Sequence, residues 1–166
     1  PLRFGRAAAI PGFADERTGS RLRQRFGYVF KGQFGYPSIV ELNSLELMRI
    51  HAGFAVEHVL MPHGPISSVG YRFEADGKSI GYATDFSEIT DDMVELFADI
   101  DILVTDCLRR EAHPTHASLA TALELGQRSR AGCTVLTHLD KSMDHAELTA
   151  EVPNGVVVGY DGLSLV

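Results

Sequence analysis

The stretch Ser68–Asp85, which reads SVGYRFEADGKSIGYATD, decides the fold class of this chain. Val69–Ala75 and Ser79–Thr84 are short runs rich in apolar, aromatic and β-branched residues, a composition typical of strands. Asp76-Gly77 between them favours a tight turn that needs positive φ, so the two runs predict a β-hairpin. The second strand of this hairpin leads directly into a carboxylate, Asp85.

The sequence before this hairpin predicts one further strand and one helix. Ala55–Met61 has the composition of a strand. Residues 15–26 form a short amphipathic pattern, with Asp15 as N-cap, and Gly27 is expected to end the helix. Residues 30–37 mix glycine with aromatic residues and show no period, which favours either a loop near a substrate mouth or a packed loop.

The sequence after the hairpin alternates helices and buried strands. A helix capped by Thr90 or Asp91 runs to Ala98, and the apolar run Ile100–Thr105 ends in Asp106 as a strand buried on both faces would. Antiparallel strands followed by a strand-helix-strand unit predict an α+β fold with a mixed sheet and helices on one face. The remaining expected elements are a helix over Ala117–Ala131, a strand over Thr134–Thr137, a helix over Asp144–Ala150, and closing strands over Val156–Tyr160 and Leu163–Val166.

Composition bounds the class of protein. With 166 residues, 45% hydrophobic and 22% charged, the whole chain, residues 1–166, is expected to form a single globular domain. The net charge of −7 argues against nucleic acid as a partner. There is no apolar run of about 20 residues and no signal-peptide layout, so we expect a cytoplasmic protein without a membrane partner. Cys107 and Cys133 are expected to be small buried thiols in a reducing compartment.

Four residues stand where a rigid strand end, or the start of a helix, could hold a side chain over a cleft: His63, Asp85, His116 and His138. Each has a plainer interpretation, since His63 and His138 fit as packed or surface histidines, Asp85 as a turn or cap residue, and His116 as an ordinary first residue of a helix. Imidazole nitrogen and carboxylate oxygen are nevertheless the donors that zinc and similar ions prefer. His63, Asp85 and His138 are therefore candidates for a metal site, although two histidines and one aspartate are too few for two ions.

Four short segments occur in one order along the chain: Pro62-His63-Gly64, Val69-Gly70-Tyr71-Arg72, Ile80–Asp85 and Leu136–Asp140. Together they resemble the metallo-β-lactamase superfamily. The resemblance implies a four-layer αββα fold, of which this chain would be an incomplete, C-terminal portion. The family's N-terminal metal motif, His-x-His-x-Asp-His, does not occur in this sequence.

The same resemblance implies a metal site and its ligands. His63 would bind the first of two divalent ions, zinc or manganese, Asp85 would bridge both ions, and His138 would bind the second. Asp106, at the end of a strand, and Asp140, beside His138, would orient the ligands from behind.

Within the superfamily, the segment Arg109–His116 before a helix is similar to phosphodiesterase branches, notably the phosphoribosyl cyclic phosphodiesterases of phosphonate breakdown. This similarity implies hydrolysis of phosphodiesters or cyclic nucleotide-like phosphates by a hydroxide that two metal ions activate, with a small phosphate ester as substrate. His116 would act with Asp85 in catalysis as donor of a proton to the leaving oxygen. His113 and Arg109 are candidates for contacts with the phosphate.

Two other functions stay open. Other branches of the superfamily hydrolyse thioesters or lactones. A second alternative is a non-catalytic module of the same fold, whose histidines only pack. A half sandwich also exposes an apolar sheet face, which predicts association with a second copy of the chain.

Overall fold

The computed structural model describes residues 8–165. Its contacts group the chain into two compact units, one ending at His51 and one beginning at Ala52. The sequence led us to expect one domain. That the chain is the C-terminal portion of a larger domain stays a prediction.

The first unit contains a strand-helix-strand arrangement around a parallel strand pair. The N-cap of α1 (Glu16–Arg25) is Asp15, whose side chain accepts a hydrogen bond of 3.1 Å from the Thr18 N–H, which confirms the start of the predicted helix. Phe26 is its C-cap, and Gly27, which we expected to end it, begins α2 (Gly27–Lys31). The parallel pairing, from Ile10 against Val40 to Ala14 against Ser44, was not predicted. The elements are β1 (Ile10–Ala14), α1 (Glu16–Arg25), α2 (Gly27–Lys31), β2 (Val40–Ser44) and the 3-10 helix η1 (Leu45–Leu47).

The predicted loop over residues 30–37 differs at its start. Residues up to Lys31 belong to α2, and the remainder forms a tight turn closed by paired Gln33 and Tyr36. Phe34 at the tip of this turn is 89% exposed, and its φ is 53°. A location near a substrate mouth stays a prediction.

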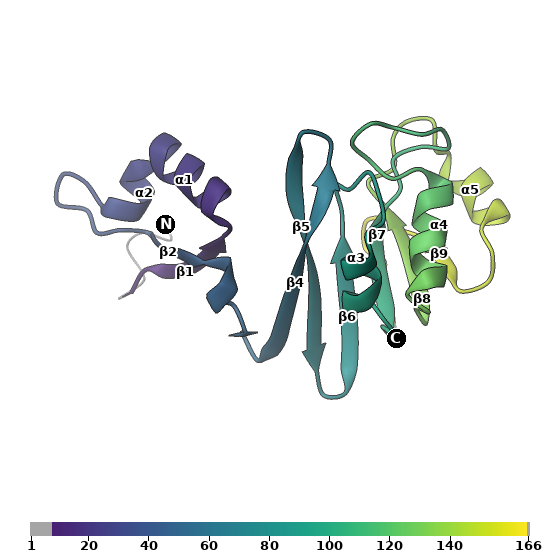
Figure 1. The fold of residues 1–166 in the computed structure, drawn as a ribbon, viewed down its shortest axis with the longest axis horizontal. Coiled ribbons are helices and arrows are strands. Elements are labelled where there is room, and N and C mark those ends of the chain that lie inside the picture. The colour runs from purple at the N-terminus through teal and green to yellow at the C-terminus, as the bar shows by residue number, and fades with distance from the viewer. Residues whose placement is uncertain (1–7, 166) are drawn as a thin grey trace. The chain divides into compact units, whose positions relative to one another are not determined.

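The larger sheet is mixed, as the sequence predicted. Its order is β3-β4-β5-β6-β7-β8-β9 (Figure 1). β4, β5 and β6 are antiparallel neighbours, whereas β6, β7, β8 and β9 are parallel. The strands are β3 (Ile50–His51), β4 (Phe54–His63), β5 (Ile66–Ala75), β6 (Lys78–Ala83), β7 (Ile102–Asp106), β8 (Cys133–Thr137) and β9 (Val156–Val158).

The hairpin that decides the fold class is formed as expected. Ala75 pairs with Lys78, so the loop between β5 and β6 consists of Asp76 and Gly77 alone. Both residues have positive φ, 51° and 73°, which is the backbone that a two-residue hairpin turn with the right twist requires.

The three helices of the second unit begin at capping side chains. Thr90, Ser118 and Asp144 each accept a hydrogen bond from a backbone N–H in the first turn, which fixes the starts of α3 (Asp91–Leu96), α4 (Leu119–Arg128) and α5 (His145–Glu151). Among residues 8–165, none of these or the other helices is long and apolar enough to cross a membrane.

Two predicted boundaries at the end of the chain were wrong. β9 stops at Val158 rather than Tyr160, although the Gly159 N–H still donates to Leu136 of β8. Leu163–Leu165 form no strand and follow a turn at Gly162, which has φ of 90°. Val166 lies outside the described residues.

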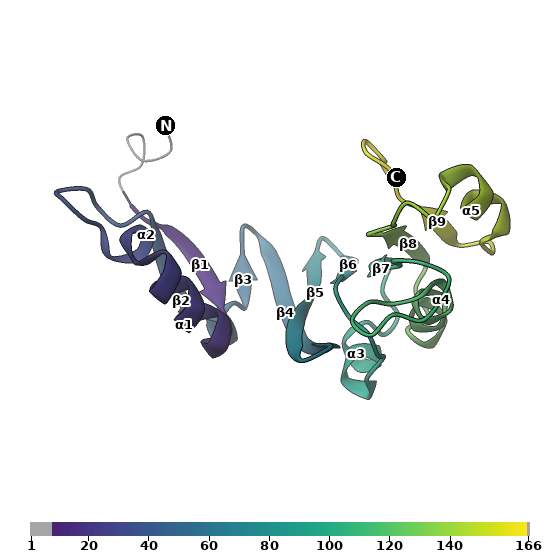
Figure 2. The ribbon, with the colours of Figure 1, turned by 90° about the horizontal axis from the view of Figure 1, so that it is seen from above.

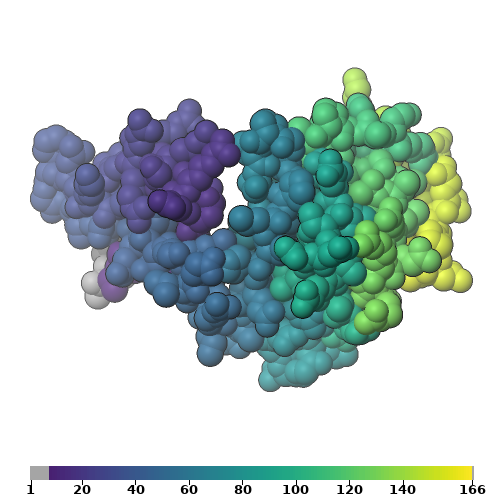
Figure 3. Space-filling model, viewed as in Figure 1, coloured from purple at the N-terminus to yellow at the C-terminus, as the bar shows by residue number. Residues whose placement is uncertain are grey.

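Helices cover one face of the sheet. α3 and α4 lie on the same side (Figure 2), and Figure 3 shows that side closed by side chains around them. Phe97 and Ile100 pack directly over Gly81 of β6, where an added Cβ would lie 2.8 Å from each. The neighbouring side chains Ile80 and Tyr82 point to the opposite face and are 42% and 45% exposed. The core of the second unit therefore lies between the sheet and its helices.

Candidate metal centre

The candidate residues meet because parallel strands end at one edge of the sheet. Ala83 of β6 pairs with Thr105 of β7, and Asp106 pairs with Thr137 of β8, so the three strands end side by side. Asp106 is the last residue of β7, while Asp85 and His138 follow β6 and β8. Residues that are 53 positions apart in the chain therefore lie at one edge.

His63 reaches the same edge from the antiparallel part of the sheet. β4 and β6 both run antiparallel to β5, so β4 also ends at this edge, and His63 is its last residue. Its Nδ1 lies 2.7 Å from the backbone carbonyl of Thr115, in the segment between β7 and α4. This contact joins β4 to the segment that carries His116.

His116 is held by a loop that is folded back on itself. The Leu108 N–H donates to the Ala117 carbonyl, and the Leu119 N–H donates to the Arg109 carbonyl. These two hydrogen bonds join the ends of the loop, and His116 lies where β6, β7 and β8 end.

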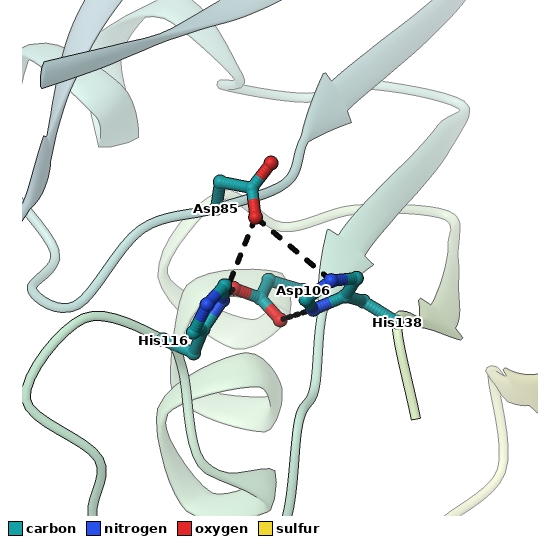
Figure 4. Close-up of side chains that lie close together, drawn as sticks. All are labelled: Asp85, Asp106, His116 and His138. Carbon is teal, nitrogen blue, oxygen red and sulfur yellow. Dashed lines mark hydrogen bonds and ion pairs between the residues drawn. The ribbon is translucent and has the colours of Figure 1, made fainter. Parts of the chain in front are cut away.

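Four side chains form a compact cluster (Figure 4). Donor atoms of Asp85, Asp106, His116 and His138 all lie within 4.8 Å of one another. His116 Nδ1 is 2.9 Å from Asp106 Oδ2, and His138 Nδ1 is 3.3 Å from Asp106 Oδ1. Asp85 Oδ1 stands across from both rings, 3.6 Å from His116 Nδ1 and 3.9 Å from His138 Nε2.

The imidazole rings continue the cluster on both sides of His116. The ring centroids of His116 and His138 are 4.7 Å apart and stacked, and those of His63 and His116 are 4.9 Å apart. His113 lies 5.2 Å from His116. The structure thus brings together every histidine that the sequence singled out for the site.

Two side chains of the cluster are buried and two are partly exposed, and the exposed pair forms its front. The Asp106 side chain is fully buried and that of His116 is 15% exposed, whereas those of Asp85 and His138 are 46% and 44% exposed. Asp85 and His138 also share an uncommon backbone, with φ of 61° and 62°. Non-glycine residues adopt this left-handed conformation only at some cost in free energy, and they concentrate at functional sites.

Three predicted residues lie around the cluster with other partners. The Arg109 guanidinium donates to the carbonyls of Glu111 and Ala112 within its own loop. The pKa of His113 is lowered, because partial desolvation disfavours the charged ring and Arg109 repels it. Asp140 accepts hydrogen bonds from the hydroxyl and N–H of Ser142, which lower the pKa of its carboxyl. The carboxylate that contacts His138 is Asp106.

Cys107 lies beside the cluster without belonging to it. Its side chain is fully buried in an apolar cluster with Leu136 and Leu148, and burial raises the pKa of the thiol to about 12. The thiolate is the reactive and ligating form, so this cysteine is an inert part of the core.

The donor set fits a divalent metal ion. Both oxygens of Asp106 are already engaged by imidazole and backbone N–H groups, which leaves the front of the cluster to coordinate. At this front, the Asp85 carboxylate lies across from His116 and His138, so the cluster offers carboxylate and imidazole donors to an ion. Imidazole with carboxylate is a ligand combination that zinc and manganese accept.

Comparison with known proteins agrees with this geometry. The family model for the beta-lactamase superfamily domain matches residues 1–139. The crystal structure of a diphosphatase from the PhnP family is 32% identical over 94% of this chain, with a TM-score of 0.80. The chain spans 57% of the length of that diphosphatase.

More distant structures share the fold. The metallo-beta-lactamase fold protein YhfI from Bacillus subtilis is 16% identical, with a TM-score of 0.74, over 98% of this chain and 67% of its own. Zn²⁺-bound PqqB from Methylobacterium extorquens is 20% identical, with a TM-score of 0.72, over 99% and 67%. No curated protein matches the chain by sequence. The family model and the 32% identical diphosphatase show that this chain belongs to the metallo-β-lactamase superfamily of hydrolases and resembles the PhnP family.

Proposed function

We propose that this protein hydrolyses phosphodiesters, with a small phosphodiester or a cyclic nucleotide-like phosphate as substrate. The observation that carries the proposal is the cluster of Asp85, His116 and His138 at one open edge, with His116 backed by a buried carboxylate. The 32% identical relative, a diphosphatase, also acts on a phosphate compound.

In this proposal, His63, Asp85 and His138 are the residues that would hold divalent ions, zinc or manganese. Bound ions would neutralise charge on the phosphate oxygens and make a water more acidic. A second ion needs more donors than these three residues, and a His-x-His-x-Asp-His segment would supply them.

His116 is the proton donor in this proposal. Its Nδ1 faces the buried carboxylate of Asp106, so in the charged ring the hydrogen on Nε2 is the one that can pass to the leaving oxygen. A carboxylate behind an imidazole also stabilises the charged ring. Arg109 and His113, on the same loop, are proposed to contact the phosphate. Two guanidinium nitrogens of Arg109 donate to carbonyls of that loop, and its remaining N–H groups are suited to phosphate oxygens.

The proposal is tested by metal content and by hydrolysis, on this chain and on a longer chain in which a His-x-His-x-Asp-His segment precedes Pro1. We expect zinc or manganese to bind, and the bound ion to be lost in Asp85→Asn and His138→Ala. We expect His116→Ala to keep its metal but to hydrolyse bis(p-nitrophenyl) phosphate about 10²- to 10⁴-fold more slowly, because a positioned acid contributes that much.

His145→Ala is the matched control, since His145 packs on Tyr160 at the start of α5, outside the cluster. It should retain both metal and activity. Hydrolysis of a thioester in place of the phosphodiester would favour the other enzymatic branch. If the longer chain takes up no metal, the protein is a non-catalytic module and the proposal is wrong.

A further inference from the structure

The buried carboxylate of Asp106 is surrounded by four nitrogen atoms at hydrogen-bond distance. Its Oδ2 lies 2.9 Å from His116 Nδ1, 3.3 Å from the Phe86 N–H and 3.4 Å from the Ala117 N–H. Its Oδ1 lies 3.3 Å from His138 Nδ1. A buried carboxylate is stable only when such partners satisfy its oxygens, and Asp106 has them from three separate segments of the chain.

These contacts decide where the histidine protons are. An ionised carboxylate only accepts hydrogen bonds, so each ring nitrogen that faces it must carry a hydrogen. His116 and His138 both face Asp106 through Nδ1. The carbonyl of Thr115 is likewise only an acceptor, and it faces Nδ1 of His63 at 2.7 Å. All three neutral rings then have their lone pair on Nε2.

We propose that Asp106 is a positioning residue that sets the tautomers of His116 and His138 together, from behind the cluster. Its place in the fold explains how one residue can do so. β7 lies between β6 and β8, and its last residue stands beside the end of β8 and below the loop that returns to α4. Figure 4 shows Asp106 between the two rings, with Asp85 on the other side. The functional meaning of this arrangement rests on the proposed function, but the tautomers themselves do not.

An amide in place of the Asp106 carboxylate should affect the two rings differently. Asparagine has the shape of aspartate but offers one accepting oxygen and one donating NH₂. Three N–H groups converge on the Oδ2 position, so the amide oxygen belongs there and the NH₂ group takes the Oδ1 position. The NH₂ group then faces His138 Nδ1, which must accept. Asp106→Asn should therefore move the hydrogen of His138 to Nε2 and leave His116 unchanged.

The experiment is a two-bond ¹H–¹⁵N correlation spectrum of the ¹⁵N-labelled, metal-free chain at about pH 8.5, well above the ordinary histidine pKa of about 6.5. In the unsubstituted protein we expect His63, His116 and His138 all to carry the hydrogen on Nδ1. In Asp106→Asn we expect only His138 to switch, with His63 as internal control. Asp101→Asn, at a carboxylate that binds Ser79 instead, should change none of them.

A metal titration provides the second readout. The switched His138 has no lone pair on Nε2, so Asp106→Asn should bind zinc about 10- to 100-fold more weakly, as loss of an orienting partner does, while Asp101→Asn should not. A neutral His116 or His138 ring with its hydrogen on Nε2 in place of Nδ1 in the unsubstituted protein would overturn the inference even if the variant failed to fold. An unchanged His138 in a folded Asp106→Asn would also overturn it. Normal tautomers, with no metal uptake by the longer chain, would instead refute the proposed function alone.

Discussion

Two residues of the cluster have a left-handed backbone that is strained for any residue with a Cβ. Asp85 and His138 have φ of 61° and 62°, a region in which only glycine is at ease. Both are partly exposed, so loss of their side chains removes little packing. The sequence at these two positions is therefore explained by the site better than by the stability of the fold.

This strain predicts an unusual order of stability at position 138. His138→Gly and His138→Ala lose the same imidazole, but only alanine keeps a Cβ in the left-handed region. We expect the glycine variant to be the more stable by about 1 kcal/mol, measured by urea unfolding. At Val135, inside β8, the order should reverse, because glycine weakens ordinary strand backbone. Equal stability of the two variants at position 138 would show that the strain is absent.

At this scale the sequence predicted which residues meet, but not how they meet. His63, Asp85, Asp106, His116 and His138 were all singled out, since strand ends and helix starts are visible in the chain. That one carboxylate contacts two rings was not predictable, because it depends on the register of β7 against β8 and on the returning loop. The carbonyl of Thr115 gives no sequence signal at all.

At the scale of elements, a small polar junction ties β6 to β7. Asp101, just before β7, accepts hydrogen bonds of 2.8 Å from both the N–H and the hydroxyl of Ser79, and the pKa of its carboxyl is lowered by these bonds. The two strands pair in parallel from Ile80 against Ile102 onward. This junction therefore adds to the backbone pairing at the start of the two strands, at the end away from the cluster.

Because the pKa of Asp101 is lower in the folded chain than in the unfolded chain, its contribution to stability has a defined pH dependence. It is fully present above the unfolded pKa of about 3.9 and is lost as the pH falls through the folded pKa. Asp101→Asn should be less stable than the unsubstituted protein at neutral pH, and the difference should shrink in acid. Urea midpoints at about pH 7 and pH 3 measure this. Asp161→Asn, in the exposed C-terminal turn, is the matched control for the loss of one carboxylate.

Elements with a strong local signal were predicted, and those that depend on tertiary pairing were not. The hairpin over Asp76-Gly77 and the capped helices follow from turn chemistry and from Asp15, Thr90 and Asp144. β1 was missed because Pro11 and Gly12 are poor strand residues, so that it forms only against β2. The end of α4 was placed too late, since Ser129 already caps it at Arg128.

At the scale of the whole molecule, the site belongs to one unit. His63, Asp85, Asp106, His116 and His138 all follow Ala52, where the second compact unit begins. Exposed Arg49 precedes the turn at Ala52 and Gly53, both of which have positive φ. Association through the face that carries Ile80 and Tyr82 stays a prediction.

This division predicts the outcome of limited proteolysis. Trypsin should cut early after Arg49 and leave a persistent product that begins at Ile50, because exposed segments between compact units are preferred sites of cleavage. Mass spectrometry identifies the product, and the histidine correlation spectrum shows whether its cluster is intact. Cleavage within α4 at the same rate as at Arg49 would show that the second unit does not hold together by itself.

The buried thiol of Cys107 can report how often the second unit opens. A sulfhydryl with no exposed surface and a pKa of about 12 is closed to alkylating reagents while the strand ends stay together. It becomes reactive only in molecules whose sheet has opened at the very place where Asp106 stands. The rate at which iodoacetamide alkylates Cys107 therefore measures how often the site opens. A ligand that stabilises the closed site should lower this rate.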